Sequence, residues 1–519
     1  MNPIVYCDAY KTEHYRMYPE NTTLINSNLT PRKSRLNGVN SIVVFGIQAF
    51  IIKYLIGEFV KNFFNRPWSE VENEYKYAIN TPTAHIKQLH DLGYMPLIIR
   101  ALAEGARCPI RVPCMTVENT KPEFYWLVNY LETLLSTQLW QPITSATIAA
   151  EYRKLLTKYA LETTNSSDFV QWQAHDFSMR GLSSLESGIL SAMGHLVSFT
   201  GTDTIPAIYA VRDFYGSEGL IGASVPATEH SVMCMGEKES EIDTFSRLLD
   251  LYPTGILSVV SDTWDLWKVL TDYVPKLKDK ILARDGKLVI RPDSGDPVDI
   301  ICGLPKYEKT LIAGGACFQD TKGQEGHGRR VNSEAEAKGV IELLWDVFGG
   351  TTVKGADGNE YKVLDSHIGA IYGDSITLER AKEICERLKA KGFASTNIVL
   401  GVGSYTYQYN TRDTFGFAVK ATYGEVEVIC NDSNGRPSIV REAREIWKDP
   451  ITDDGTKKSA KGLLFVGWDA DKKEYYLKDQ VTRAMYESDE NQLKPVFKDG
   501  VLLKRWTFDE IRKRVAEFS

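Results

Sequence analysis

The stretch KLVIRPDSGDP, residues 287–297, carries the pattern that decides the fold. A short apolar run ends abruptly at Arg291, and a polar turn with a glycine and two aspartates follows. Apolar runs of this length are typical of buried parallel strands, because both faces of such a strand are covered. The same pattern recurs in SVVSD (258–262), HIGAIYGDS (367–375) and NIVLGVGS (397–404).

Helical patterns separate these runs. Apolar side chains from Leu378 to Leu388 repeat on one helical face, and Gly392 follows where the helix is expected to end. A second such face runs from Ile242 to Leu249. Strands that alternate with helices and end in polar residues predict an α/β fold, an irregular β/α barrel whose chemistry lies in the loops after the strands.

The expected division of the chain follows from the same patterns. The barrel is predicted over residues 166–410, with a glycine-rich insertion near 303–364 that includes a helix near 333–348. The flanking regions, 1–165 and 411–519, combine short strands with aromatic-rich segments. Patterning alone leaves open whether they form two domains or one α+β domain built from both chain ends.

Composition excludes several classes of protein. The chain has 519 residues and a net charge of −7, with 61 Lys and Arg against 68 Asp and Glu, which argues against a broad nucleic-acid surface. Its 8 cysteines are scattered without zinc or redox spacing, so free thiols are expected. The N-terminus does not resemble a signal peptide, and charges such as Lys53 and Glu58 interrupt the most apolar stretch, 41–64. We therefore expect a soluble, cytoplasmic protein with an amphipathic core helix at that stretch.

Three of the predicted loops carry groups suited to a phosphorylated sugar. Arg291 can bind a phosphate with two hydrogen bonds, and Asp293 can hold ribose hydroxyls or Mg²⁺. Asp374 follows a glycine before a helix, and the backbone at Gly403 and Ser404 can wrap an anion. Taken alone, the first loop is equally consistent with an ordinary turn and the other two favour one, but together they favour a sugar phosphate with a diphosphate and its Mg²⁺.

Two further segments offer other chemistry. HDFSMRG (175–181) combines Phe177 and Arg180, which suit a flat heteroaromatic amide or acid, although a packed phenylalanine with a structural ion pair is favoured in isolation. SVPATEHS (224–231) contains His230, which could accept a phosphoryl group if a carboxylate orients its ring. Asp262, at the end of SVVSD, is the candidate orienter.

In this order, the segments resemble the nicotinamide phosphoribosyltransferases, a branch of the type II phosphoribosyltransferases. The resemblance runs from residue 8 to residue 513 and so covers essentially the whole chain. The matching stretches are DAYKTEHYRMYP (8–19), VENTKPEFYWLVNYLETLL (117–135), HDFSMRGLSS, FTGTDT (199–204), SVPATEHS, SVVSDTWD, IRPDSGDP, GDS, TRDTFGF (411–417) and WTFDEIRK (506–513).

The resemblance implies both an architecture and a reaction. It implies an irregular β/α barrel packed against an α+β domain formed by both chain ends, in a homodimer with shared active sites. The implied reaction joins nicotinamide to the ribose of phosphoribosyl pyrophosphate, giving nicotinamide mononucleotide and pyrophosphate in NAD salvage. Mg²⁺ is the implied metal, and ATP hydrolysis through a phosphohistidine is implied to assist. Neither a nucleic acid nor a membrane is implied as a partner.

The resemblance also assigns roles to individual residues. Phe177 and Tyr10, the latter from the partner subunit, would hold the pyridine ring, and Arg180 and Asp203 would bind its amide. Ser224, Val225, Ser258 and Arg291 would line the rest of the base site. His230 would be phosphorylated, with Asp262 beside it, and Asp293 and Asp374 would bind ribose and Mg²⁺. The implied phosphate-binding residues are Arg32, Gly373, Asp374, Gly403, Ser404, Arg412, Lys448 and Lys457.

Asp203 bears on the choice of base. A carboxylate accepts a hydrogen bond from the amide of nicotinamide and repels the carboxylate of nicotinate, which favours nicotinamide. The alternatives are a nicotinate phosphoribosyltransferase and a non-catalytic relative that binds nucleotides. An unrelated phosphate-binding barrel enzyme, such as an aldolase, is not supported, because this sequence has no lysine plausibly placed at a strand end to form a Schiff base.

Overall fold

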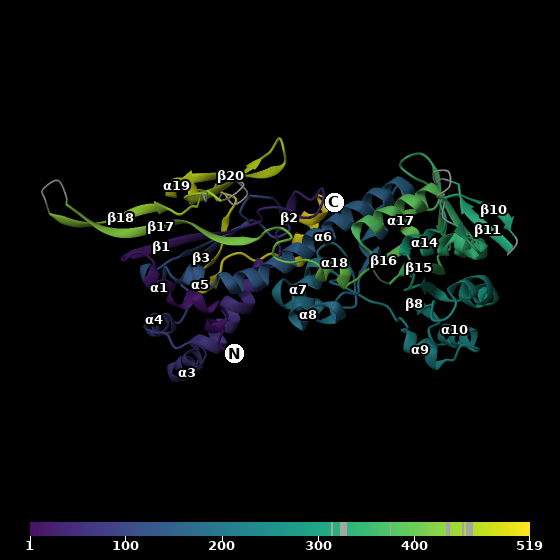
Figure 1. Cartoon of the computed structure of the whole chain (residues 1–519), viewed down its shortest axis with the longest axis horizontal. Coiled ribbons are helices and arrows are strands. Elements are labelled where there is room, and N and C mark those ends of the chain that lie inside the picture. The colour runs from purple at the N-terminus through teal and green to yellow at the C-terminus, as the bar shows by residue number, and fades with distance from the viewer. Residues whose placement is uncertain are drawn as a thin grey trace. The chain divides into compact units, whose positions relative to one another are not determined.

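The computed structural model describes residues 1–312, 315–321, 330–373, 375–431, 436–448, 451–452 and 460–518 (Figure 1). The chain forms two compact units. The first comprises Met1–Thr147, Tyr209–Gly219 and Asn410–Phe518, and the second comprises Ile148–Ile208 and Leu220–Tyr409. The long helix α6 (Glu132–Thr164) contributes residues to both units.

The first unit is organised around a seven-stranded antiparallel sheet in the order β18-β17-β1-β5-β3-β21-β22. Strands from the first third of the chain pair directly with strands from its end, and β17 and β18 extend as a long hairpin (Figure 1). Both chain ends therefore build one α+β unit, which resolves the alternative that patterning left open. The strands are β1 (Thr22–Thr30), β3 (Leu97–Ala101), β5 (Met115–Asn119), β17 (Ala418–Asn431), β18 (Pro437–Glu445), β21 (Lys494–Lys498) and β22 (Val501–Leu502).

The apolar stretch 41–64 is only partly the helix that its pattern predicts. It opens with the short strand β2 (Ser41–Val43), and the helical part begins with α2 (Ile47–Phe50). The break occurs at Gly46, whose φ of 95° favours glycine. The buried Glu104 carboxylate accepts hydrogen bonds from the backbone N–H groups of Gly46 and Gln48, at 3.2 and 2.6 Å. Among the described residues, no helix has the length and apolar character needed to span a membrane.

The second unit contains a six-stranded parallel sheet in the order β7-β6-β16-β15-β9-β8. The segment 223–228 lies between its two edge strands: Ala223 bridges to Gly201 of β7, and Ala227 bridges to Ser258 of β8. These bridges close the sheet into the irregular barrel that the sequence predicts. The strands are β6 (Ala174–Asp176), β7 (Gly201–Thr202), β8 (Thr254–Val260), β9 (Asp285–Arg291), β15 (Ile368–Tyr372) and β16 (Ile398–Val402).

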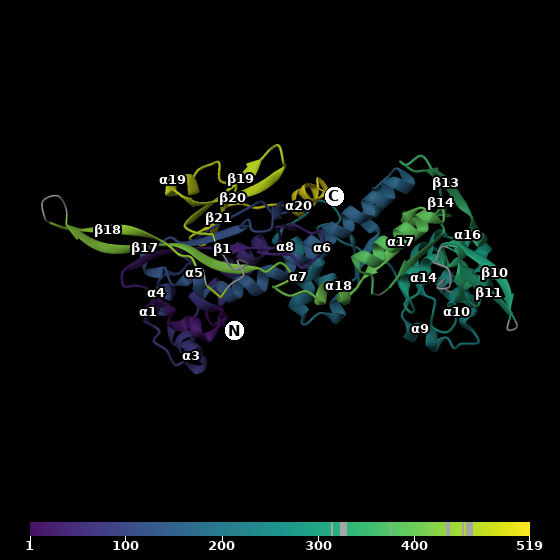
Figure 2. The ribbon, with the colours of Figure 1, turned by 45° about the horizontal axis from the view of Figure 1, so that its top comes forward.

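Helices cover the outside of the barrel. Helix α17 (Leu378–Ala390) packs on α14 (Pro297–Cys302), and α16 (Val340–Phe348) packs on β15 (Figure 2). The apolar face predicted for α17 is buried, and its N-cap Thr377 accepts a hydrogen bond from the backbone N–H of Arg380. Helix α10 (Glu241–Leu251) likewise buries its predicted face. These four helices hold the strand ends, and therefore the loops after them, in place.

The insertion has a fold of its own. Strands β10 (Tyr307–Ile312), β11 (Gly315–Asp320) and β12 (Arg330–Val331) form a small sheet, and β13 (Gly350–Lys354) pairs with β14 (Glu360–Leu364). The helix predicted over 333–348 is two helices, α15 (Glu334–Lys338) and α16, separated by Gly339. Gly339 has a φ of 77° and packs directly against the backbone of Gly303, where a side chain would clash. The close contact explains the break.

Candidate active site

The parallel strands bring the predicted loops to one end of the barrel. Their register places Val260 beside Arg291, Tyr372 beside Leu400, and Asp176 beside both Val402 and Thr202. Because the carboxyl ends of neighbouring strands coincide, the residues that follow them are neighbours too. The second unit therefore gathers Phe177, Asp203, Asp262, Arg291, Asp293, Gly373 and Gly403 at the carboxyl ends of its strands.

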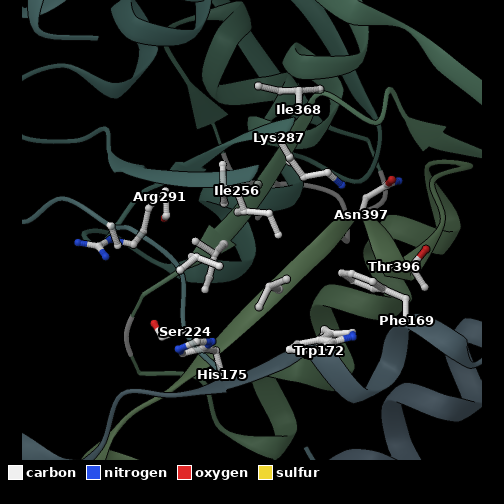
Figure 3. Close-up of a pocket in the computed structure, with 18 of the residues that line it drawn as sticks. Phe169, Trp172, His175, Ser224, Ile256, Lys287, Arg291, Ile368, Thr396 and Asn397 are labelled. Atoms are coloured by element: carbon white, nitrogen blue, oxygen red, sulfur yellow. The ribbon is translucent and has the colours of Figure 1, made fainter. Parts of the chain in front are cut away.

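A cavity of about 680 Å³ occupies the barrel. At the carboxyl ends of the strands it is lined by residues predicted for the base site: Phe177, Asp203, Ser224, Val225, Ser258 and Arg291. At the amino ends it is lined by Phe169, Trp172, Thr396 and Asn397, as Figure 3 shows. Its walls are mostly apolar, with a few polar groups, which is typical of a site for a small flat ligand.

Phe177 is positioned by the backbone of the neighbouring strand. Its N–H donates to the carbonyl of Val402 at 3.0 Å. Gly401 leaves room for the ring, because a Cβ there would lie 2.8 Å from Phe177 Cδ2. The ring lies 4.6 Å from that of His175, centroid to centroid. These contacts fix one aromatic wall of the cavity.

The buried carboxylate of Asp176 ties two of these loops together. Its Oδ1 accepts hydrogen bonds from the backbone N–H and the hydroxyl of Ser178, at 3.0 and 2.6 Å. Its Oδ2 accepts from the hydroxyls of Thr202 and Thr204, at 2.9 and 2.7 Å. Ser178 follows Phe177, and the two threonines flank Asp203. One carboxylate thereby fixes the backbone on both sides of the cavity mouth.

The Asp203 carboxylate is held from one side. His175 Nε2 lies 2.9 Å from its Oδ1, and the Ser224 hydroxyl donates to the same oxygen at 2.5 Å. Burial acts to raise the pKa of Asp203, but the hydrogen bonds from His175 and Ser224 and the nearby charge of Arg291 outweigh it, so the pKa is lowered. Asp203 therefore carries its negative charge into the cavity.

Arg291 lies among three carboxylates. Burial lowers its pKa, and the charges of Asp293, Asp203 and Asp262 oppose that shift. Its Nη2 donates to the carbonyl of Thr228 at 2.5 Å. Among the described residues, Arg291 Nε, Ser258 Oγ and Asp262 Oδ1 are buried without a hydrogen-bond partner. Buried polar atoms are nearly always paired in folded proteins, so this cluster is suited to a bound ligand.

The loop after β9 is braced by its neighbours. Asp262 Oδ2 accepts hydrogen bonds from the backbone N–H of Asp293, at 2.8 Å, and from the hydroxyl of Ser294, at 2.6 Å. Gly373 packs against the Asp293 carboxylate, where a Cβ would lie 2.5 Å from Oδ1. Asp374 lies outside the described residues. Within the described part of the chain, no three His, Cys, Asp or Glu side chains are grouped to hold a metal ion.

His230 does not bond to the carboxylate that the sequence suggests for it. It is exposed at the start of α9 (His230–Met235), and its Nδ1 lies 3.2 Å from the Thr263 hydroxyl. Asp262 instead binds the loop after β9, because residues two positions past Val260 and Arg291 meet across the paired strands. The hydrogen bond that the structure gives His230 is therefore to the Thr263 hydroxyl, and the role of Asp262 as its orienter stays a prediction.

The remaining predicted residues of the second unit surround the same opening. Ser404, which begins α18 (Ser404–Gln408), packs closely against Gly181, where a Cβ would clash with it. Arg180 precedes Gly181, is exposed, and lies near enough to Arg291 for their charges to interact. Two cationic side chains and the backbone at Gly403 therefore face the same end of the barrel.

The first unit carries a second set of the predicted residues. Tyr10 is 63% exposed, and Arg32 donates through Nε to the carbonyl of Gly416 at 2.9 Å. Burial lowers the pKa of Lys420, the charge of Glu132 opposes the shift, and Arg32, Lys448 and Lys11 add to it. These cations are therefore close together. Arg412 is exposed beside Asp413, and Lys457 lies outside the described residues.

Sequence reasoning missed several residues of both sets. The sequence pattern assigns no role to His175, Lys287 or Lys420. A signal for Lys287 exists, because Lys287, Val289 and Arg291 alternate along β9 and all line the cavity. No such signal identifies Lys420, whose neighbours come from distant parts of the sequence.

The fold and the site define a class: a β/α-barrel protein whose strand ends combine cationic, acidic and aromatic groups around a small-ligand cavity. Residues 172–500 match the nicotinate phosphoribosyltransferase (NAPRTase) family, and residues 2–73 match the N-terminal domain of nicotinamide phosphoribosyltransferase. The chain belongs to the nicotinate phosphoribosyltransferase family.

Individual relatives agree with this assignment. A nicotinamide phosphoribosyltransferase of Acinetobacter baylyi is 47% identical, over 100% of this chain and 97% of the relative. One of Xanthomonas campestris is 30% identical, over 98% and 97%. Among solved structures, human nicotinic acid phosphoribosyltransferase matches with a TM-score of 0.53 at 13% identity, over 98% of this chain and 93% of that chain. At that identity the structural likeness supports the fold alone.

Proposed function

We propose that this chain transfers the phosphoribosyl group of phosphoribosyl pyrophosphate to nicotinamide, giving nicotinamide mononucleotide and pyrophosphate in NAD salvage. The observation that carries the proposal is the full-length likeness, at 47% identity, to a protein named for this reaction. The barrel cavity supports it, because Phe177 offers a ring face and Asp203 offers a charged acceptor at one opening.

The base would lie against Phe177 with its amide at Asp203. The amide nitrogen has hydrogens to donate, and the Asp203 carboxylate accepts them. Nicotinate has a carboxylate at the same position and would be repelled. Ser258 Oγ and Arg291 Nε lack hydrogen-bond partners among the described residues, and they would donate to the amide oxygen of nicotinamide.

The sugar and its diphosphate would lie over the loops after β9, β15 and β16. The ring nitrogen attacks the anomeric carbon while the bond to the diphosphate oxygen breaks, and pyrophosphate leaves with the electron pair. Holding both reactants in place supplies much of the rate, so no protein nucleophile on the sugar is needed. Backbone N–H groups at Gly403 and Ser404 would stabilise the negative charge that develops on the diphosphate.

Mg²⁺ fits this end of the barrel. Asp262 Oδ1 is buried without a partner among the described residues, and Asp293 follows on the adjoining loop. Mg²⁺ usually binds one or two carboxylates together with phosphate oxygens and water. Asp293, with Asp374, would hold the ion, which when bound neutralises charge on the diphosphate.

ATP would act through His230. With Nδ1–H donating to the Thr263 hydroxyl, Nε2 keeps its lone pair and is the nitrogen that would attack the γ-phosphorus of ATP, with ADP as the leaving group. Water would later hydrolyse the phosphohistidine. We expect His230→Ala to abolish stimulation by ATP, so that initial rates with and without ATP become equal. Stimulation that persists in this variant would remove His230 from the proposal.

A homodimer with shared sites would bring the first unit of one subunit to the barrel of its partner. The exposed Tyr10 and the cluster of Arg32, Lys420 and Lys448 support this, because they suit an aromatic base and an anion. We expect Tyr10→Ala and Phe177→Ala to be weak alone and to regain activity when mixed, because hybrid dimers contain one intact site. Mixtures no more active than their components would contradict sharing. A cytoplasmic location stays a prediction.

One assay tests the reaction itself. The purified chain is incubated with Mg²⁺, phosphoribosyl pyrophosphate and either base, and the nucleotide formed is identified by mass. We expect nicotinamide to be converted with a much higher kcat/KM than nicotinate. The family name keeps the nicotinate reaction as the second candidate, and a preference for nicotinate would establish it instead.

A further inference from the structure

The His175 ring is closely packed by two neighbouring residues. Its residue pairs with Gly201 across β6 and β7, and a Cβ at Gly201 would lie only 2.7 Å from His175 Nδ1. The Phe177 ring lies 4.6 Å from the His175 ring, centroid to centroid, with an angle of 37° between the two ring planes. The imidazole therefore has little freedom to turn, and its Nε2 stays directed at Asp203, 2.9 Å away.

The direction of this hydrogen bond is fixed by chemistry. An ionised carboxylate only accepts hydrogen bonds, so the hydrogen must be on His175 Nε2. The Ser224 hydroxyl donates to the same oxygen, Asp203 Oδ1. Among the described residues, no protein donor reaches the other oxygen, Oδ2, and the Asp203 side chain is 45% exposed. Oδ2 is thus the oxygen left to accept a hydrogen bond from a ligand.

The backbone of Asp203 is immobilised separately. Its N–H donates to the Asp176 carbonyl at 3.0 Å, and the threonines on either side bind the Asp176 carboxylate. The remaining freedom of Asp203 is rotation of its carboxylate. Arg291 is close enough to attract that carboxylate electrostatically. His175 and Ser224 are the groups that hold it away from a closer pairing with Arg291.

We infer that His175 is a positioning residue that sets the preference for a carboxamide over a carboxylate, by holding Asp203 so that one oxygen faces the base. The inference rests on the proposed function and deepens it. Without the His175 hydrogen bond, the Asp203 carboxylate would turn toward Arg291. Its charge would then be neutralised, it would accept from the amide less well, and it would repel nicotinate less.

The test compares His175→Phe with His175→Gln. Phenylalanine keeps a flat ring between Gly201 and Phe177 but cannot donate, whereas the glutamine amide can. For each variant, kcat/KM is measured with nicotinamide and with nicotinate. We expect His175→Phe to reduce the preference for nicotinamide roughly tenfold, as the loss of one charge-assisted hydrogen bond would. His175→Gln should restore most of the preference.

A double-substitution cycle identifies the route of the effect. If His175 acts through Asp203, His175→Phe should not alter the base preference of an Asp203→Ala protein. Ser224→Ala removes the second donor to Oδ1 and should shift the preference in the same direction, which keeps the test decisive if His175→Phe folds poorly. Ile256→Leu changes another residue that lines the cavity, one with no hydrogen bond to Asp203, and serves as the matched control that should leave the preference unchanged.

The outcomes separate the two proposals. Equal losses with both bases in His175→Phe, or the same shift in the Asp203→Ala background, would overturn the role of His175 while leaving the proposed reaction intact. A wild-type protein that prefers nicotinate would overturn the proposed function, and the inference with it.

Discussion

The Asp176 carboxylate is the group whose removal should most clearly link stability to activity. It accepts four hydrogen bonds, and its donors are fully or nearly fully buried: Ser178 and Thr204 are 0% exposed and Thr202 is 1% exposed. Water cannot replace the lost acceptor without rearrangement. An unsatisfied buried donor costs about 1–3 kcal/mol.

The expected size follows from counting the donors that cannot find another acceptor. The hydroxyls can rotate, but the Ser178 N–H cannot, and three hydroxyls compete for few acceptors. We therefore expect Asp176→Ala to lower the free energy of unfolding of the second unit by about 3–5 kcal/mol. Asp176→Asn keeps the shape and one acceptor oxygen, and should cost about half as much. Thr204→Val, which removes a single donor, should cost about 1–2 kcal/mol.

Urea unfolding followed by tryptophan fluorescence measures these differences, with circular dichroism as a second probe because the two units can unfold separately. The same proteins are then assayed for KM, since Phe177 and Asp203 both border the residues that Asp176 holds. We expect KM for nicotinamide to rise in Asp176→Asn while kcat changes less. An Asp176→Ala protein that unfolds at the wild-type urea concentration would refute the reasoning.

Three further predictions concern individual sites. His85 is 6% exposed, and burial lowers its pKa from 6.5 to about 4. Below pH 6.5 the unfolded chain therefore binds the proton more readily than the folded chain, and the free energy of unfolding falls as the pH drops from 6.5 toward 4. His85→Phe should therefore remove up to about 3 kcal/mol of acid sensitivity in urea titrations, and an unchanged pH profile would contradict this. Gly201→Ala should lower stability by about 1–3 kcal/mol, seen as a lower Tm, because the methyl group would press on His175. Gly339→Ala should cost about 2 kcal/mol, since φ is 77° and Gly303 leaves no space; a wild-type Tm in either glycine variant would be contrary evidence.

The strands of the barrel could be predicted because their signal is local. The runs at 367–375 and 397–404 contain the whole of β15 and β16, and the runs at 258–262 and 287–297 contain the carboxyl ends of β8 and β9. Most of their apolar residues are buried, and the polar or glycine residue that follows each apolar stretch falls at or just after the strand end. The polar residues at the strand ends also predict one common site, because the carboxyl ends of parallel strands lie at the same edge of the sheet.

Other features depend on contacts between residues that are distant in the sequence, and no local sequence pattern indicates them. The segment 223–228 completes the barrel wall, yet it contains Pro226 and no apolar run. The bond between His175 and Asp203 joins residues on different loops. The hydrogen bond of His230 goes to Thr263, while the loop after β9 binds the Asp262 carboxylate, and this pairing depends on the register of β8 and β9.

The way the barrel closes has a mechanical consequence. The stretch that bears Ser224 and Val225 is attached to β7 and β8 by single bridges, whereas β8 and β9 share a ladder of seven paired residues. The wall that bears Ser224 and Val225 is therefore held less extensively than the wall formed by β8 and β9, and its amides should exchange with deuterium before those of β9. We expect a ligand slightly wider than the cavity to be accommodated by movement of the segment 223–228, while β8 and β9 keep their positions.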